Sequence, residues 1–466
     1  MSRLSRRSFL AASAALIAAP ALRVDSAGAA DVDVAVIGAG AAGIAAARRI
    51  AAAGRSVRVI EASKRIGGRC VTDTATFGVP FDLGAHWIRN PNGNPLARLA
   101  PKGFDVYRAP RGLSMRIGQR DARDAELENF LASLVRTRRA IDDAGHGRVD
   151  MPAAKALPRD LGAAQGAIEF VAGPLACGKD LSDVSVNDLG RAVERDDDAF
   201  CRQGYGALLA KLAARLPVEL ADPVDAIAWR RGPAVSSRRG SLVARAVILT
   251  VSTNVLVSGK IEFFPPLPLH VRAAAEKLSL GSYDHIALDM PGNPLGLLQD
   301  DFVFEQAQGK RTAALLANVS GTGLHLVEVA GSFGRDLSAK GERAMIAFAQ
   351  EWLGSLFGAS VKRKIKRARA TRWNHEPFVL GAMSAAAVGG VPARQALMEP
   401  LGDRVWFAGE AVHETKWGTV EGAWESGERA ANAVLRYLGG LKPESTKKKP
   451  ARNSRHRYRR QRGRDR

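Results

Sequence analysis

The chain has 466 residues, of which 46% are hydrophobic and 25% are charged. This composition is typical of folded globular proteins and excludes wholesale disorder, and the length corresponds to more than one domain at about 150 residues each. The formal net charge is +21, but the segment 442–466 alone holds twelve Lys and Arg residues against two acids. A basic tail on a mildly basic body is a weak argument for nucleic-acid binding. None of the three cysteines stands in a C-x-x-C spacing, so we expect no metal site.

Residues 1–30 are typical of a twin-arginine signal peptide. Arg6 and Arg7 precede an apolar run over 11–22, and small residues follow at 27–30. The run is short for a membrane span, which leaves a retained anchor as the less favoured alternative. We therefore expect recognition by the twin-arginine export machinery and a periplasmic location. The Lys/Arg-rich segment 441–466 is predicted to be a disordered tail that can bind anionic surfaces nonspecifically.

The first predicted elements form a β-turn-α unit. Apolar residues over 32–37 predict a strand, an alanine-rich helix follows over 44–53, and a second strand over 57–60 ends at Glu61. In the turn, Gly38, Gly40 and Gly43 have the spacing G-x-G-x-x-G, which allows a pyrophosphate to approach the backbone at a helix N-terminus. A carboxylate 18 residues after the last of these glycines is placed to accept hydrogen bonds from a ribose. The predicted dinucleotide contacts here also include Ala41, Ala42 and Ala62.

Further along the chain, helical periodicity predicts an insertion over 121–143 and an amphipathic helix over 342–357. A strand over 404–408 and a helix over 422–438 close the fold. Strand-helix alternation at both ends, with other material between, indicates a discontinuous nucleotide-binding domain.

Six further blocks accompany the glycine-rich turn in a fixed order. They are Arg65–Arg69, Phe81–Ile88, Gly204–Gly206, Ala246–Val251 with Trp373, Phe407–Glu410 and Gly418–Ala423. With these blocks the chain resembles the flavin-containing amine oxidases, the family of monoamine, polyamine and L-amino acid oxidases.

The resemblance implies an α/β fold with two domains. The first is a discontinuous, Rossmann-like FAD-binding domain of the GR2 type, expected over 31–95, 203–258 and 370–440. The second is a substrate domain with a mixed sheet and a helical insertion, expected over 96–202 and 259–369.

The resemblance also implies which residues meet FAD. Gly68 and Arg69 are expected near phosphate, and the segment Gly84, Ala85, His86 and Trp87 near the flavin ring or the substrate cavity. The remaining expected contacts are Val224 at the adenine, Trp373, Gly409, Glu410, Thr419 and Val420. An unpaired carboxylate at Glu410 would be costly after the apolar strand, so a ligand hydroxyl is its expected partner.

The chain departs from the family pattern near the reacting atoms. His285 stands where the family usually has a lysine that reaches the flavin through a water molecule. An imidazole can hold that water, so His285 is the candidate catalytic residue, although a strand histidine without a catalytic role is an equal alternative. Met383 and Thr419 stand where aromatic walls are common, and with His86 they are expected to line the substrate cavity. Ala382 stands where some members have a cysteine, so FAD is expected to bind noncovalently.

The implied activity is oxidation of the C–N bond of an amine or amino acid to an imine. O2 is the expected electron acceptor and H2O2 the product. A flavin dehydrogenase or desaturase with another acceptor fits the same residues, and a noncatalytic flavin-fold protein that binds anionic surfaces through its tail remains an alternative.

Overall fold

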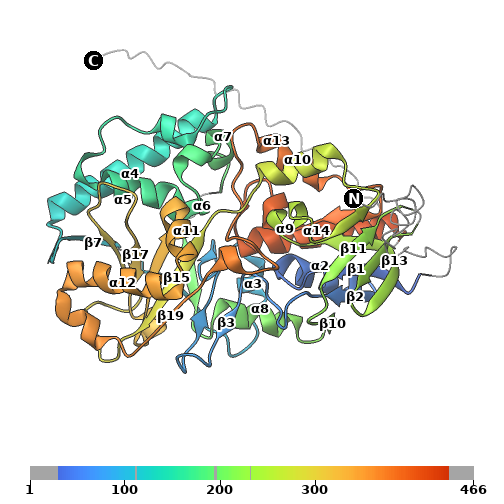
Figure 1. Cartoon of the computed structure of the whole chain (residues 1–466), viewed down its shortest axis with the longest axis horizontal. Helices are drawn as coiled ribbons and strands as arrows, with labels where there is room; N and C mark the ends of the chain where they lie inside the picture. Colours follow the sequence, from blue (N-terminus) through green and yellow to red (C-terminus); the bar gives the residue numbers. More distant parts are fainter. Residues whose placement is uncertain (1–29, 111–112, 194–196, 231, 440–466) are drawn as a thin grey trace, which may run out of the picture.

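The computed structural model describes residues 30–110, 113–193, 197–230 and 232–439. Two sheets, each covered by helices, lie side by side along the long axis of the molecule (Figure 1). The predicted signal over 1–30, all but its last residue, and the predicted tail over 441–466 lie outside the described residues.

The first sheet is built around the predicted strand β1. Its order is β10-β2-β1-β13-β12-β11-β14, with β20 also paired to β13. The strands β10, β2, β1, β13 and β20 pair in parallel, while β12 pairs antiparallel with both of its neighbours. Their bounds are β1 Val32–Ile37, β2 Val57–Ile60, β10 Val218–Glu219, β11 Val224–Ala228, β12 Ala234–Ser237, β13 Gly240–Leu249, β14 Glu262–Phe264 and β20 Val405–Phe407.

Two helices from opposite ends of the chain cover one face of this sheet. α2 (Ala41–Ala52) and α14 (Val420–Tyr437) share a core of small and branched residues with β1 and β13. Both helices begin two or three residues before their predicted starts. For α2 the reason is Gly40, whose extended backbone ends the turn, so the helix starts directly at Ala41.

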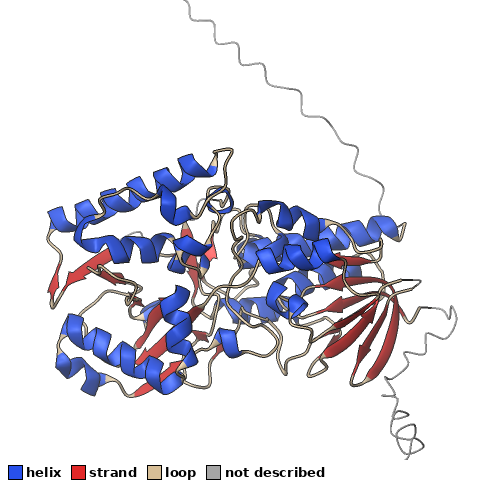
Figure 2. Cartoon of the chain, turned by 45° about the horizontal axis from the view of Figure 1, so that its top comes forward, coloured by secondary structure: helices blue, strands red, loops and turns tan. Residues whose placement is uncertain are grey.

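The second sheet is mixed, as expected for a substrate domain. Its order is β19-β15-β18-β17-β16-β7-β8, antiparallel except for the pair of β16 with β7. One face carries α11 and α12, and the other carries α4 and α5 (Figure 2). The bounds are β7 Leu113–Ile117, β8 Arg120–Asp121, α4 Asp124–Gly145, α5 Gln165–Ala172, β15 Tyr283–Asp289, β16 Phe302–Glu305, β17 Ala314–Leu316, β18 Leu324–Ala330, α11 Gly331–Ala339, α12 Glu342–Phe357 and β19 Arg367–Ala370.

The first domain extends further along the chain than expected. The expected boundary at 258 would leave β14 and α10 in the substrate domain. Instead β14 pairs with β11, and α10 (Leu269–Lys277) packs into the core of the first sheet through Val271, Ala274 and Ala275. The first domain therefore continues to about Leu278, which is buried in the same core.

α9 (Thr253–Val257) and α13 (Val391–Met398) pack with α10 in the core of the first sheet. Two small sheets accompany the large ones. The first pairs β3 (Thr72–Asp73) with β4 (Phe81–Asp82), and the second has the order β5 (Ile88–Arg89), β9 (Asp198–Cys201) and β6 (Val106–Arg108). The remaining α-helices of the described ranges are α3 Pro95–Arg98, α6 Pro174–Cys177, α7 Val186–Leu189 and α8 Tyr205–Ala213. Cys70, Cys177 and Cys201 are buried and form no disulfide with one another. Within the described ranges, no helix combines the length and the apolar character needed to cross a bilayer.

Candidate active site

The glycine-rich turn lines a cavity whose wall also includes residues of the second sheet. Gly38 has a φ of +103°, and a Cβ there would lie 2.5 Å from Oγ1 of Thr250. Gly40 faces Gly67 and Gly68, so two backbone segments approach without side chains between them. No side chain caps the first N–H groups of α2. Those groups are therefore available to an anion, as a pyrophosphate requires.

Glu61 supports this turn from the end of β2. Its carboxylate is buried and accepts hydrogen bonds from the backbone N–H of Ala39 at 2.7 Å and of Ser63 at 2.8 Å. It also lines the cavity. Glu61 thus has protein donors in addition to any ribose hydroxyl.

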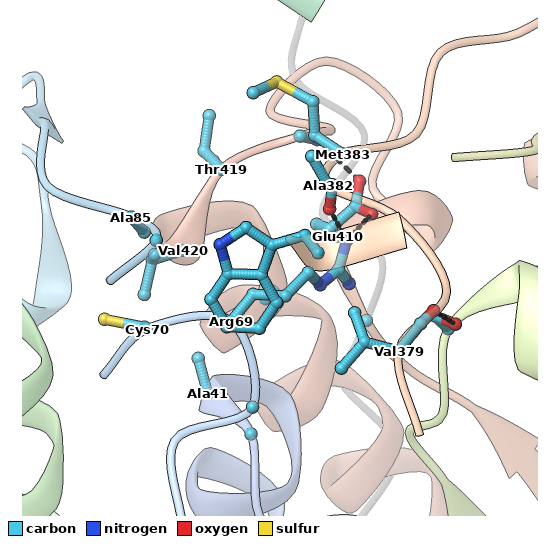
Figure 3. Close-up of a pocket in the computed structure, with 18 of the residues that line it drawn as sticks. Ala41, Arg69, Cys70, Ala85, Val379, Ala382, Met383, Glu410, Thr419 and Val420 are labelled. Atoms are coloured by element: carbon cyan, nitrogen blue, oxygen red, sulfur yellow. Dashed lines mark hydrogen bonds and ion pairs between the residues drawn. The ribbon is translucent and has the colours of Figure 1, made fainter. Parts of the chain in front are cut away.

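Arg69 and Glu410 meet in the middle of the cavity wall. Nη1 of Arg69 lies 2.8 Å from Oε1 of Glu410 and also donates to the carbonyl of Ala382 (Figure 3). These hydrogen bonds come from Nη1 alone, which leaves Nε and Nη2 for a phosphate. The expected contact of Arg69 with phosphate stays a prediction.

Glu410 has several protein partners, and its expected contact with a ligand hydroxyl stays a prediction. Besides Arg69, its carboxylate accepts from the backbone N–H and hydroxyl of Ser384 and from the N–H of Gly418 at 2.8 Å. Burial alone would raise the pKa of Glu410, but Arg69 and Ser384 more than offset it, and the pKa lies below its usual value. Glu410 is therefore an ionised group that joins three segments of the cavity wall.

The N-terminus of α14 points into the same cavity. Thr419 is its N-cap and accepts from the N–H of Gly422 at 2.9 Å, and Thr419 and Val420 both line the cavity (Figure 3). Thr419 therefore caps α14 and lines the cavity at the same time. A helix N-terminus at this place stabilises negative charge on a bound group.

A buried carboxylate fixes His86. Asp82 accepts from the backbone N–H groups of Tyr205 and Gly206, and its Oδ2 lies 3.0 Å from Nδ1 of His86. Nε2 of His86 is buried without a hydrogen-bond partner. Since His86 lines the cavity, this nitrogen is a polar group available to a ligand.

His285 lines the cavity from β15, on the second sheet. It is 2% exposed, its Nδ1 lies 3.0 Å from the carbonyl oxygen of Asp82, and its Nε2 lies 3.8 Å from Oε1 of Glu328. Burial lowers the pKa of His285 to about 4, so the imidazole is neutral at neutral pH. A carbonyl can only accept, so Nδ1 carries the proton and Nε2 is the basic atom.

Most of the expected site residues line this one cavity. They are Gly38, Gly40, Ala41, Ala42, Glu61, Gly68, Arg69, Gly84, Ala85, His86, Trp87, His285, Trp373, Met383, Gly409, Glu410, Thr419 and Val420. Three expected residues are not among the lining side chains: Gly43, Ala62 and Val224. A Cβ on Gly43 would lie 1.9 Å from the carbonyl oxygen of Gly38, so this glycine allows α2 to pack on the turn.

Several lining residues were not expected. Tyr283 stands two positions before His285 on the same face of β15, and Arg89 follows the expected segment by two residues. Arg89 pairs with Asp198 and its guanidinium lies 5.3 Å from the ring centre of Trp87. Gly67, Thr250, Gly418 and Ala423 belong to the blocks that carry the family resemblance, and Ala382 was singled out as the position of a cysteine in some members. The other lining residues that were not expected are Cys70, Leu175, Ala176, Ser252 and Val379. The alternation of a strand predicts Tyr283 once His285 is placed.

Aromatic side chains reach the cavity from positions other than those usual in the family. Met383 and Thr419 do line it, as expected, and Trp87, Tyr283 and Trp373 supply aromatic faces from other segments. Nε1 of Trp373 donates to the carbonyl of Leu83 at 2.9 Å, which fixes the indole against the Gly84 segment.

These features fit FAD. The cavity combines an uncapped helix N-terminus at glycines, an arginine with unused donors, and a second helix N-terminus at Thr419. Its lining runs from the glycine-rich turn of the first sheet to Tyr283 and His285 of the second. Such a lining suits a dinucleotide with a flat ring.

Comparisons with known proteins agree with this geometry. The family model "Flavin containing amine oxidoreductase" matches residues 41–111 and 167–435. Rice polyamine oxidase 1 is 26% identical over 87% of this chain and 98% of its own length. A rice lysine-specific histone demethylase 1 homolog is 28% identical over 86% of this chain, and the match spans about half (52%) of that relative.

Solved structures share the fold. Cyclohexylamine oxidase from Brevibacterium oxydans superposes with a TM-score of 0.72 at 22% identity, over 88% of this chain and all of that one. Putrescine oxidase bound to putrescine gives a TM-score of 0.72 at 21% identity, over 87% and 99% of the two chains. With the family model matching most of its length, the chain belongs to the flavin-containing amine oxidoreductases and is an FAD-dependent enzyme of that family.

Proposed function

We propose that the enzyme oxidises the C–N bond of an amine or amino acid to an imine, with O2 as the electron acceptor and H2O2 as the product. The observation that supports this most is the position of His285, whose basic Nε2 belongs to a neutral, buried imidazole on the substrate-domain wall of the cavity. A bound flavin supplies a two-electron acceptor.

The protein groups bind and orient the substrate. The amine must be neutral to give up a hydride, and a buried, neutral histidine can accept its proton. Trp87, Tyr283 and Trp373 provide flat apolar surfaces beside it. The N-terminus of α14 favours negative charge at the opposite end of the ring site.

The charges on the cavity wall favour substrates with one amino group. Both carboxylates among the lining residues, Glu61 and Glu410, already accept hydrogen bonds from the protein. Arg89 also lines the cavity, and its charge is paired with that of Asp198. A second ammonium would find no free carboxylate there, so monoamines and amino acids are the proposed substrates.

Anaerobic mixing with a matched panel of monoamines, diamines and amino acids tests this function. Bleaching of the flavin absorbance by monoamines or amino acids, faster than by diamines of equal length, is expected. Absence of bleaching by every compound would contradict amine oxidation.

The electron acceptor is tested in a second step. Admitting O2 to the reduced enzyme should restore the absorbance and release H2O2 in equal amount. Reoxidation by a quinone but not by O2 would instead establish a dehydrogenase.

We further propose that the protein is exported folded to the periplasm, with FAD bound noncovalently. Arg6 and Arg7 before an apolar run support the first point, and Ala382 at the cavity wall supports the second, because alanine has no nucleophile. Replacing both arginines with lysine should retain the protein in the cytoplasm, while Arg3→Lys should not. Denaturation should release FAD into the supernatant.

A further inference from the structure

A buried carboxyl group stands behind the cavity wall. Glu328 lies on β18, directly across from His285 on β15, so the two side chains share one face of the sheet. Glu328 has no exposed surface, and neither of its carboxyl oxygens forms a hydrogen bond of ordinary geometry. On its other side the cross-strand neighbour is Ala314, which offers no polar side chain.

An ionised carboxylate in such a place is costly unless it gains a proton or a cation. Burial raises the pKa of Glu328 to about 7, although nearby Tyr283, His86, Arg89 and Trp87 each lower it. Near neutral pH the group is therefore divided between a neutral acid and a buried negative charge.

The hydrogen bonds of His285 show which of its ring nitrogens is basic. Nδ1 faces the carbonyl of Asp82 and carries the proton, so Nε2, 3.8 Å from Oε1 of Glu328, holds the lone pair. A movement of about 1 Å brings these two atoms to hydrogen-bond distance. The other charged or titratable groups acting on His285 are His86 and Asp82.

We propose that Glu328 and His285 form a proton-sharing pair in which Glu328 is a positioning residue. Protonated Glu328 holds its proton toward Nε2 and so occupies the lone pair of that atom. Ionised Glu328, which has already released its proton to solvent, leaves Nε2 free to accept the proton of a cationic amine on entry and stabilises the imidazolium that forms. In that step the N–H bond of the ammonium breaks and an N–H bond to Nε2 forms. No electrons are transferred, and the amine is left neutral. Glu328 acts through His285 and does not touch the substrate.

The inference rests partly on the proposed function, so two measurements on the holoenzyme separate them. The first is the pH profile of kcat/KM for an amine substrate in wild type and Glu328→Gln. Glutamine keeps the shape of the side chain at this position but cannot ionise. The wild type is expected to lose kcat/KM below an ionisation near pH 7 that is missing in the variant, whose value at pH 8 falls about 10-fold. An unchanged profile in Glu328→Gln would overturn the pair.

The second measurement needs no substrate. Between pH 4.5 and 7 folded Glu328 binds more protons than the unfolded chain, so wild type loses stability relative to Glu328→Gln as the pH rises. The difference in melting temperature should therefore grow through this window in favour of the variant and level off above about pH 8. A constant difference would also overturn the pair, whether or not any amine is oxidised.

Glu305→Gln is the matched control. Glu305 lies on β16 of the same sheet, is partly buried and does not line the cavity. Its replacement should leave the kcat/KM profile unchanged. If Glu305→Gln removes the same ionisation as Glu328→Gln, the effect belongs to the sheet as a whole and the pair is refuted.

Discussion

Arg69 and Glu410 are 341 positions apart in the chain, yet Nη1 of Arg69 lies 2.8 Å from a carboxylate oxygen of Glu410. This contact joins the segment after the first βαβ unit to the turn after β20. It holds the two sides of the cofactor groove together before any ligand binds.

Replacing Glu410 with Gln should weaken FAD binding. The amide cannot balance the charge of Arg69 in a partly buried place, and a lost charged hydrogen bond costs about 2 kcal/mol, or roughly 30-fold in the Kd of FAD. Titration of the apoprotein by flavin fluorescence measures this. Glu219→Gln, in an exposed pair with Arg58 of the same domain, is the control and should keep the wild-type Kd.

Replacing Gly43 with Ala should prevent α2 from packing on the turn. The added Cβ would lie 1.9 Å from the carbonyl oxygen of Gly38, a backbone atom that cannot move aside cheaply. We expect a loss of at least about 3 kcal/mol in the free energy of unfolding, with loss of bound flavin. Gly309→Ala, where the Cβ meets nothing within 4 Å, should change stability by less than about 0.5 kcal/mol. Equal stabilities in a denaturant titration would contradict this view of the turn.

The buried pair of Asp188 and Arg394 should be essential for stability. Nε and Nη2 of Arg394 donate to the two carboxylate oxygens at 2.8 and 2.7 Å, and both side chains are almost fully buried. Asp188→Ala leaves a buried unpaired charge and should cost about 3–5 kcal/mol. Glu276→Ala, in an exposed pair with Arg272, should cost less than about 1 kcal/mol.

His325 should make the protein sensitive to acid. Burial lowers the pKa of His325 to about 4, so between pH 6.5 and 4 the unfolded chain binds a proton that the folded chain does not. The free energy of unfolding therefore falls as the pH drops through this window, and it should fall less in His325→Gln than in the wild type. Melting temperatures at pH 7 and pH 4 test the difference, with the exposed His146→Gln as the control. Parallel losses in wild type and His325→Gln would rule out this role.

Local patterns predicted well which residues of the glycine-rich turn line the cavity. The turn of Gly38 and Gly40 and the end of β2 at Glu61 are set by short-range geometry, because a strand, a tight turn and a helix follow one another within 30 residues. The start of α14 was predicted less well, because Thr419 was not used as the cap that sets it and the helix was expected to begin two residues later.

The substrate half was less predictable because it depends on pairing between distant strands. Glu328 carries no local signal, and only the register of β15 against β18 places it beside His285. Likewise, the partners of Glu410 come from three separate loops. The residues next to Glu410 in the sequence therefore could not predict which groups balance its charge. The position of α10 in the first domain depends on the pairing of β14 with β11 in the same way.

The packing of α14 on α2 also constrains the order of events during biosynthesis. A Cβ on Gly427 would lie 2.1 Å from the carbonyl oxygen of Ala42, so the last helix closes tightly over the first. The β1 strand meanwhile takes β13, more than 200 residues later, as a neighbour. The ribosome must therefore synthesise nearly the whole polypeptide before β13 and α14 can pack against β1 and α2. Until then the nascent chain exposes an apolar surface that chaperones can recognise.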